Sequence, residues 1–208
     1  ISAFGEHAAL PHYSVTRETN LPFKKDTIYL FDSGAQYRDG TTDITRTIII
    51  GKATKEQKDR FTRVLKGHIS IATNHFRIDS KGSELDPLAR KSLQEINCDY
   101  DHGTGHGIGS FLSVHEGPQR IAKSQGLSDG LIKEGMILSN EPGYYKENEY
   151  GIRTENLIIA IKQTDLNLQF ETISWAPIDI DLININILDY YEMVWLNNYH
   201  RKVYEKLK

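Results

Sequence analysis

Glycine occupies every second position from 103 to 109, within the stretch HGTGHGIGS at residues 102–110. Each glycine would destabilise a helix by about 1 kcal/mol relative to alanine, so a helix is not expected here. In an extended segment, His102 and His106 point to one side and the bare glycines to the other, where another backbone can approach closely. The α-carbons of the two histidines would then lie about 13 Å apart, too far for both to bind one ion. We therefore expect His102 and His106 to have different roles.

A helical zinc site is also disfavoured in this stretch. That motif has a glutamate directly after the first of two histidines four residues apart, and Gly103 stands at this position. The alternative is that both histidines are ordinary surface or core residues. The glycine context favours a functional site instead.

The composition indicates one globular domain and excludes several partner classes. The 208 residues carry a net charge of −3, which argues against nucleic acid or an anionic membrane as the main partner. No apolar run approaches the roughly 20 residues of a membrane span. Cys98 is the only cysteine, so an internal disulfide is impossible and a reducing compartment such as the cytoplasm is favoured.

Three segments have the pattern of capped, amphipathic helices. Thr54 and Gln57 form a capping-box pattern, and the apolar spacing that follows, out to Phe76, predicts a helix over 55–77. A second helix is expected to start at Ser83, Asp86 and Pro87, with a buried stripe of Leu88, Ala89, Leu93 and Ile96. A third is expected to be capped by Asp189 and Glu192, with one face formed by Trp195, Tyr199 and Val203.

The remaining sequence is typical of β-strands. Strands are predicted over residues 27–34, 43–50, 135–140 and 151–161. They do not alternate strictly with the helices, which favours an α+β domain with a curved, largely antiparallel sheet.

Four acidic residues lie near the ends of these strands or inside one. Asp32 and Asp43 end and begin two strands whose polar connection resembles a hairpin, which would bring both carboxylates to one end of the sheet. Asp39 is expected in the turn itself. Glu141 follows a strand, and Glu155 lies inside one, where a carboxylate needs a partner.

Each of these acids also has an ordinary structural explanation. Asp32 could cap a turn, Asp43 could be an exposed strand start, and Glu155 could pair with Arg153. The combination of four acids with His106 favours a metal centre instead. Together the carboxylates carry about −4, a charge that would raise their pKa values unless cations compensate it.

Two divalent cations would supply that compensation. Oxygen-rich ligation with one imidazole suits Mn²⁺, Co²⁺ or Zn²⁺, and the hard donors favour Mn²⁺. Two such ions about 3.5–4 Å apart can share a hydroxide, which is a nucleophile for a carbonyl group.

Several motifs together resemble a known family. The stretches YLFDSGAQYRDGTTDITRT, HGTGHGIGSFLSVHEGP, EPGYY and GIRTEN are similar to the catalytic domain of the Xaa-Pro aminopeptidases (aminopeptidase P), in the pita-bread metallopeptidase superfamily. The resemblance extends from AALPHYS near the start to WLNNYH near the end. It implies a pita-bread fold, with a curved antiparallel sheet backed by helices, over a single catalytic domain at residues 1–208.

The resemblance also assigns roles to individual residues. It implies that Asp32 binds one metal ion, that Asp43 and Glu155 bridge two ions, and that His106 and Glu141 complete the second site. Glu141 is the implied proton acceptor.

Four further residues match positions around that centre in the family. His12 and His115 match histidines that bind substrate, stabilise the reaction intermediate and relay protons. His102 matches a histidine that lines the substrate site, and Arg153 is expected to orient a ligand carboxylate.

The implied activity is a manganese-dependent exopeptidase that removes the N-terminal residue from peptides with proline in second position. The alternatives are an Xaa-Pro dipeptidase (prolidase), a methionine aminopeptidase and a catalytically inert peptide-binding module. The resemblance alone suggests a homodimer. It also leads us to expect that a first helical segment and upstream domains precede Ile1 in a longer protein.

Overall fold

All strand pairs in the described part of the chain are antiparallel. The structure is a computed structural model that describes residues 1–110, 113–123 and 129–208. The first sheet has the order β1-β2-β3 and consists of β1 (Ser2–Phe4), β2 (Thr27–Tyr37) and β3 (Gly40–Ile50). The second has the order β4-β11-β10-β7 and consists of β4 (His75–Arg77), β11 (Asn167–Thr172), β10 (Asn156–Lys162) and β7 (Ile137–Asn140).

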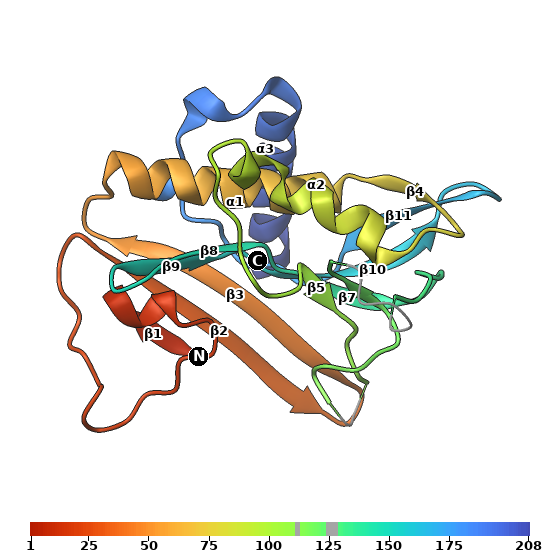
Figure 1. The fold of residues 1–208 in the computed structure, drawn as a ribbon. Coiled ribbons are helices and arrows are strands. Elements are labelled where there is room, and N and C mark those ends of the chain that lie inside the picture. The colour runs from red at the N-terminus through yellow and green to blue at the C-terminus, as the bar shows by residue number, and fades with distance from the viewer. Residues whose placement is uncertain (111–112, 124–128) are drawn as a thin grey trace.

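Two short strand pairs connect to these sheets. They are β5 (Gly105–His106) with β6 (Arg120–Ile121), and β8 (Gly143–Lys146) with β9 (Tyr150–Arg153). The long β2–β3 hairpin runs diagonally beneath α1 (Figure 1). Its residues and those around β5, β7 and β9 form the walls of one cavity.

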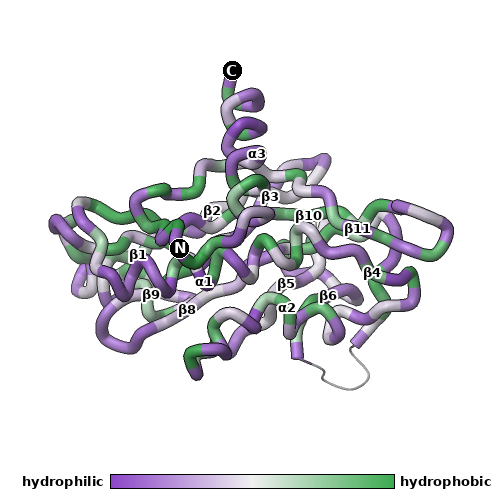
Figure 2. The backbone as a smooth tube through the Cα atoms, turned by 90° about the horizontal axis from the view of Figure 1, so that it is seen from above, coloured by the Kyte–Doolittle hydropathy of each residue, from purple (hydrophilic) through white to green (hydrophobic). Residues whose placement is uncertain are grey.

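The α-helices cover the sheets rather than the cavity. They are α1 (Lys55–Ala72), α2 (Gly82–Gln94) and α3 (Tyr190–Leu207). The described residues also form three short 3₁₀ helices, η1 (Gly5–Ala9), η3 (Ile180–Leu182) and η4 (Ile185–Ile187). In the view from above, the hydrophilic C-terminal end of α3 projects away from the remaining chain (Figure 2). No helix in the described ranges is both long and apolar enough to serve as a membrane span.

Two apolar clusters form the core around α1. One face of α1 buries Phe61, Val64 and Leu65 against residues of η3 and α3. The other cluster lies between α1, α2 and the second sheet, and it includes Ile71, Ala89, Leu138 and Ile158. Burying each such side chain contributes about 1.5–3 kcal/mol, so α1 is fixed from both sides.

The first predicted helix is confirmed at its start and wrong at its end. The Thr54 and Gln57 capping box is present in full, but α1 ends at Ala72 instead of residue 77. Phe76 lies in β4, where its ring packs on Phe170 with centroids 4.7 Å apart. Thr73 and Asn74 are poor helix formers, and the buried phenylalanine continued the helical spacing by coincidence.

The second predicted helix is present, but Asp86 has a different role from the predicted one. Asp86 lies inside α2, is buried, and pairs with Arg90 at 2.6 Å instead of capping the helix. Pro87 also lies inside the helix, and Ile96 lies beyond its end. The third helix is confirmed, with a capping box between Asp189 and Glu192.

Two strand boundaries also differ from prediction. The strands of the first hairpin extend to Tyr37 and from Gly40, so Asp32 and Asp43 lie within the hairpin and not at strand ends. The threonines at positions 41 and 42 are good strand formers, which lengthens β3. Asp39 is in the turn, as expected. The predicted strand 151–161 is divided into β9 and β10, with Thr154 and Glu155 between them.

Candidate metal centre and active site

Glu155 reaches the cavity because the chain leaves the strand ladder at this point. Its backbone N–H donates to Thr45 O (3.1 Å), and the Thr45 hydroxyl donates to its carboxylate (2.5 Å). Asp43 and Thr45 are two apart on β3, so they face the same side. This joins Glu155 to the hairpin that carries Asp43.

His106 is placed by close contact between β5 and β7. A Cβ on Gly105 would lie 2.0 Å from Ser139 O, so only glycine allows this approach. The Ser139 hydroxyl accepts from the His106 N–H (2.9 Å) and donates to the Glu141 carboxylate (3.0 Å). His106 Nδ1 lies 2.9 Å from Gly107 O. As the donor of that hydrogen bond, it leaves Nε2 with a lone pair for a ligand.

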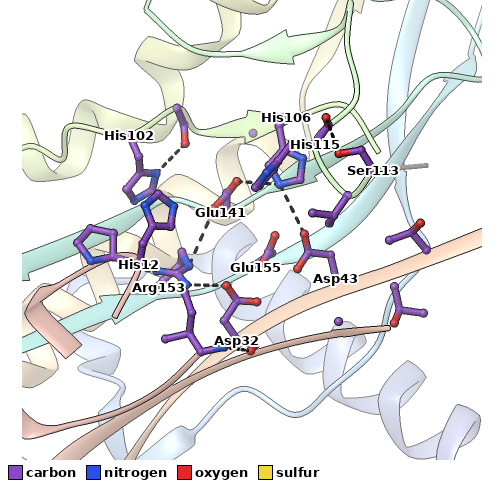
Figure 3. Close-up of a pocket in the computed structure, with 18 of the residues that line it drawn as sticks. His12, Asp32, Asp43, His102, His106, Ser113, His115, Glu141, Arg153 and Glu155 are labelled. Atoms are coloured by element: carbon purple, nitrogen blue, oxygen red, sulfur yellow. Dashed lines mark hydrogen bonds and ion pairs between the residues drawn. The ribbon is translucent and has the colours of Figure 1, made fainter. Parts of the chain in front are cut away.

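Four of the expected metal-binding side chains converge. Ligand atoms of Asp43, His106 and Glu155 all lie within 4.8 Å of one another. His106 Nε2 lies 3.5 Å from Asp43 and 3.4 Å from the Glu141 carboxylate. Figure 3 shows these side chains facing a common centre, with Asp32 at its edge. The fifth expected residue, Asp32, lines the same cavity.

Arg153 connects Asp32 to the remaining cluster. Its guanidinium donates to the Asp32 carboxylate (2.8 Å), the Thr45 hydroxyl (3.1 Å) and the Tyr145 hydroxyl (3.0 Å). It also lies 4.0 Å from Glu141. In the structure Arg153 therefore pairs with Asp32, and not with Glu155 as the ordinary explanation for that acid required.

His102 has different partners from His106. Its Nε2 lies 2.8 Å from the Tyr145 hydroxyl and its Nδ1 lies 2.7 Å from Gly103 O. Burial, with help from Arg153, lowers the pKa of His102 to about 4, so its ring is neutral near pH 7. Only Gly105 and His106 of the expected extended segment form a strand.

A buried ion pair on α2 forms hydrogen bonds to the segment before His106. Asp86 accepts from the Arg90 guanidinium and from the Thr104 hydroxyl (2.6 Å). Arg90 also donates to the backbone carbonyls of Tyr100 (2.5 Å) and His102 (2.8 Å). The α2 helix thereby fixes the approach of this segment to the cavity.

His12 and His115 lie at the exposed mouth of the cavity, which has a volume of about 810 Å³. The His115 ring meets the His106 ring edge to face, with centroids 4.2 Å apart. Partial burial and neighbouring His106 lower the pKa of His115. His12 lies beside His102 on the opposite side of the centre (Figure 3).

The cluster has an excess of negative charge that protons partly neutralise. Burial, together with Glu155, raises the pKa of Glu141 to about 8. Burial, together with Asp43 and Asp32, also raises the pKa of Glu155. Burial alone would lower the pKa of His106, but Asp43 and Glu141 raise it above its ordinary value. A donor set of carboxylate oxygens with one imidazole fits two divalent cations, which would replace those protons.

Three side chains at this site were missed by the sequence reasoning. Thr45, Ser139 and Tyr145 form hydrogen bonds to predicted site residues, which are Glu155, Glu141 and His102 respectively. Thr45 carries a signal, because it is two residues from Asp43 on the same face of a strand. The EPGYY stretch contains Tyr145, but nothing in its spacing points to His102.

Two family matches cover most of the chain. Residues 1–162 match metallopeptidase family M24, and residues 167–208 match the C-terminal region of peptidase M24. The chain belongs to metallopeptidase family M24.

Individual M24 proteins are similar to this chain in sequence and structure. A probable Xaa-Pro aminopeptidase P from Coprinopsis cinerea is 45% identical over 215 residues, which cover 100% of this chain and 34% of the fungal protein. The X-prolyl aminopeptidase of Caenorhabditis elegans, a cytosolic enzyme with a di-nuclear active site, matches with a TM-score of 0.91 at 39% identity, over 98% of this chain and 34% of that chain. Prolidase from Pyrococcus furiosus matches with a TM-score of 0.71 at 28% identity, over 83% of this chain and 47% of its own.

These matches confirm the expected fold and set its extent. The likeness to the worm enzyme confirms the pita-bread architecture. The chain spans about a third of the length of the curated relatives that it matches.

Proposed function

We propose that residues 1–208 are the catalytic domain of a dinuclear-metal exopeptidase. It would release the N-terminal residue from peptides with proline in second position. The observation that supports this most directly is the convergence of Asp43, His106 and Glu155 within 4.8 Å, in a cavity that His12, His102 and His115 also line. The similarity to Xaa-Pro aminopeptidase P supports the choice of substrate.

The five predicted ligands divide between two ions. In this proposal Asp32 would hold one ion, His106 and Glu141 would hold the other, and Asp43 and Glu155 would contact both. Bound there, the cations would supply Lewis-acid polarisation of the scissile carbonyl and the ionisation of water near neutral pH.

Glu141 is the proposed proton acceptor from the attacking water. Burial raises the pKa of its carboxyl group to about 8 in the metal-free chain. Bound cations would displace that proton and leave a carboxylate that can accept one. The Ser139 hydroxyl donates a hydrogen bond to this carboxylate and keeps it oriented toward His106.

The exposed histidines are the proposed contacts to substrate. His115 has a lowered pKa, so near pH 7 its ring is neutral and keeps one N–H to donate to the carbonyl oxygen. His12 and His115 would pass the proton that Glu141 takes from the attacking water on to the departing proline nitrogen. His102, fixed by Tyr145, would line the pocket for the peptide. Arg153 would keep Asp32 in place as a ligand.

Manganese and a cytoplasmic location belong to the same proposal. Four hard carboxylate donors with a single imidazole favour Mn²⁺ over Zn²⁺ or Co²⁺. The C. elegans relative is a cytosolic enzyme, and the lone Cys98 is compatible with a reducing compartment. The expected partners are peptides that begin Xaa-Pro.

The test is hydrolysis of Xaa-Pro-Yaa tripeptides by protein loaded with Mn²⁺, with bound metal measured in the same sample. Release of the first residue is expected, with loss of turnover in His115→Ala and retention in His75→Ala, which alters an exposed histidine on β4. Turnover confined to Xaa-Pro dipeptides would identify a prolidase, the activity of the P. furiosus neighbour. Peptide binding without turnover at full metal occupancy would identify an inert binding module.

A further inference from the structure

Arg46 is a buried cation behind the metal centre that the proposed reaction does not use. It lies on β3, is 3% exposed, and points away from Thr45 and Thr47, its neighbours on the cavity side. Within the described residues it forms no ion pair, and all its hydrogen bonds go to neutral oxygens. A buried guanidinium needs such a complete set of acceptors.

One terminal nitrogen of the Arg46 guanidinium forms a hydrogen bond to the backbone of Glu155. Nη1 donates to Glu155 O (2.6 Å) and to Thr45 O (2.7 Å). Thr45 O also accepts from the Glu155 N–H. Both ends of the Glu155 residue are thus tied to β3, at the point where it leaves the ladder between β9 and β10.

The other two guanidinium nitrogens form hydrogen bonds to the C-terminal region. Nη2 donates to the Tyr199 hydroxyl (2.6 Å) and to Ala176 O (2.8 Å), and Nε donates to Pro177 O (2.9 Å). Tyr199 lies on α3, in the WLNNYH stretch, and is 3% exposed. Its hydroxyl also accepts from Asn156 (3.0 Å), the residue directly after Glu155.

Tyr199 is itself held rigidly by aromatic contacts. Its ring stacks on Trp195 with centroids 5.1 Å apart and packs on Trp175 at 5.2 Å. Removing only the hydroxyl would leave these ring contacts in place. The chain therefore offers a substitution that separates the hydrogen bonds from the packing.

We propose that Arg46 and Tyr199 are positioning residues for the metal centre, through which α3 fixes the backbone of the bridging carboxylate Glu155. This rests on the proposed function, because it takes Glu155 as a bridging ligand. Neither residue touches the cavity, so both act through Glu155 and Asn156. The C-terminal region would thus be part of the machinery that sets the spacing of the two ions.

The experiment is titration of chelator-cleared protein with Mn²⁺ alone, for the wild-type chain, Tyr199→Phe and Arg46→Lys. The wild type is expected to bind two ions. Both variants are expected to bind the weaker ion roughly 10- to 100-fold less tightly, the usual effect of losing a group that supports a ligand. Electron paramagnetic resonance of bound Mn²⁺ is expected to show weakened coupling between the ions, because coupling depends on the bridging carboxylates.

Leu196→Ala is the matched control. It removes a buried apolar side chain from the same helix without touching Arg46. We expect it to lower thermal stability and leave Mn²⁺ affinity and the spectrum unchanged. If Leu196→Ala changes both as much as Tyr199→Phe does, the tyrosine is merely structural and the inference is wrong.

The possible failures are distinguishable. A wild type that binds fewer than two ions would refute the proposed metal centre itself. A folded Tyr199→Phe with wild-type affinity and spectrum would refute the positioning role and leave the proposed function intact. Should Tyr199→Phe not fold, Arg46→Lys decides, since it retains the charge and the bulk but cannot span Glu155 and Tyr199 together.

Discussion

The Arg153 guanidinium lies 2.8 Å from the Asp32 carboxylate, although the two residues are 121 positions apart. The same guanidinium donates to Thr45, whose hydroxyl donates to Glu155. Arg153 thus orients acids on both sides of the proposed centre. A planar guanidinium can do this because its donors point in fixed, divergent directions.

Arg153→Lys is expected to weaken Mn²⁺ binding by roughly 10- to 100-fold, since an ammonium cannot bond Asp32 and Thr45 at once. Isothermal titration with Mn²⁺ measures this. Arg77→Lys is the control, because Arg77 forms an exposed pair with Asp79 far from the cavity. Equal Mn²⁺ affinity in Arg153→Lys and wild type would contradict the orienting role.

Asp43→Ala is expected to abolish peptide turnover and reduce bound Mn²⁺ below two ions, because it removes a proposed bridging ligand. Asp39→Ala removes an acid from the turn of the same hairpin and is expected to keep both. Metal content by atomic absorption and tripeptide turnover should be measured on the same preparations. Retained turnover in Asp43→Ala would show that this acid does not bridge.

The stability of the metal-free protein is expected to fall as pH rises from about 5 to 8. Burial raises the pKa of Glu141 from its ordinary 4.5 to about 8. In that window the folded chain holds a proton that the unfolded chain has released, so raising the pH favours unfolding, by on the order of a few kcal/mol.

Denaturant unfolding across this pH range, in the presence of a chelator, measures the effect. Glu141→Gln is expected to flatten the curve, because its amide does not titrate. Mn²⁺ is expected to reverse the slope, since cations compete with protons for these ligands. A wild-type curve that rises with pH in chelator would contradict the raised pKa.

Gly105→Ala is expected to weaken Mn²⁺ binding and to destabilise the fold by about 1–3 kcal/mol, because its Cβ would lie 2.0 Å from Ser139 O. Relief of that clash must move β5 from β7, and His106 moves with it. Gly40→Ala is the control, since a Cβ there has no neighbour within 4 Å. Thermal unfolding and Mn²⁺ titration together check the two effects, and wild-type values in both would show that β5 does not need this approach.

Asp86→Ala is expected to destabilise the fold by about 3 kcal/mol, because it removes the buried carboxylate that pairs with Arg90 and leaves only the partly exposed Asp99. Denaturant unfolding measures this loss. Asp79→Ala, which breaks an exposed pair, is expected to leave the unfolding free energy almost unchanged. Equal losses in the two variants would mean that the buried pair does not support the segment before His106.

The sequence predicted which side chains share the cavity better than it predicted the residues that support them. Alternating glycines around His106 indicated close backbone approach, and Gly105 against Ser139 is that approach. The long-range partners of Arg46 could not be predicted, because they lie about 110 to 150 positions away and follow no local period.

The predicted ends of helices and strands are wrong where a local sequence pattern allows two interpretations. Phe76 satisfies the spacing of the preceding helix as well as that of a strand. The apolar residues after Glu155 predict that it lies inside a strand, whereas the hydrogen bond from its N–H to Thr45 interrupts the ladder. Such breaks depend on tertiary contacts, which local propensity does not encode.

The bond between Thr45 and Glu155 joins residues 110 positions apart. Closing so long a loop is entropically costly, so the acids meet only when most of the chain is already native. Metal capture should accordingly follow folding and not guide it. Added Mn²⁺ would then leave the refolding rate unchanged and slow unfolding. The cation would stabilise the native state without stabilising the folding transition state.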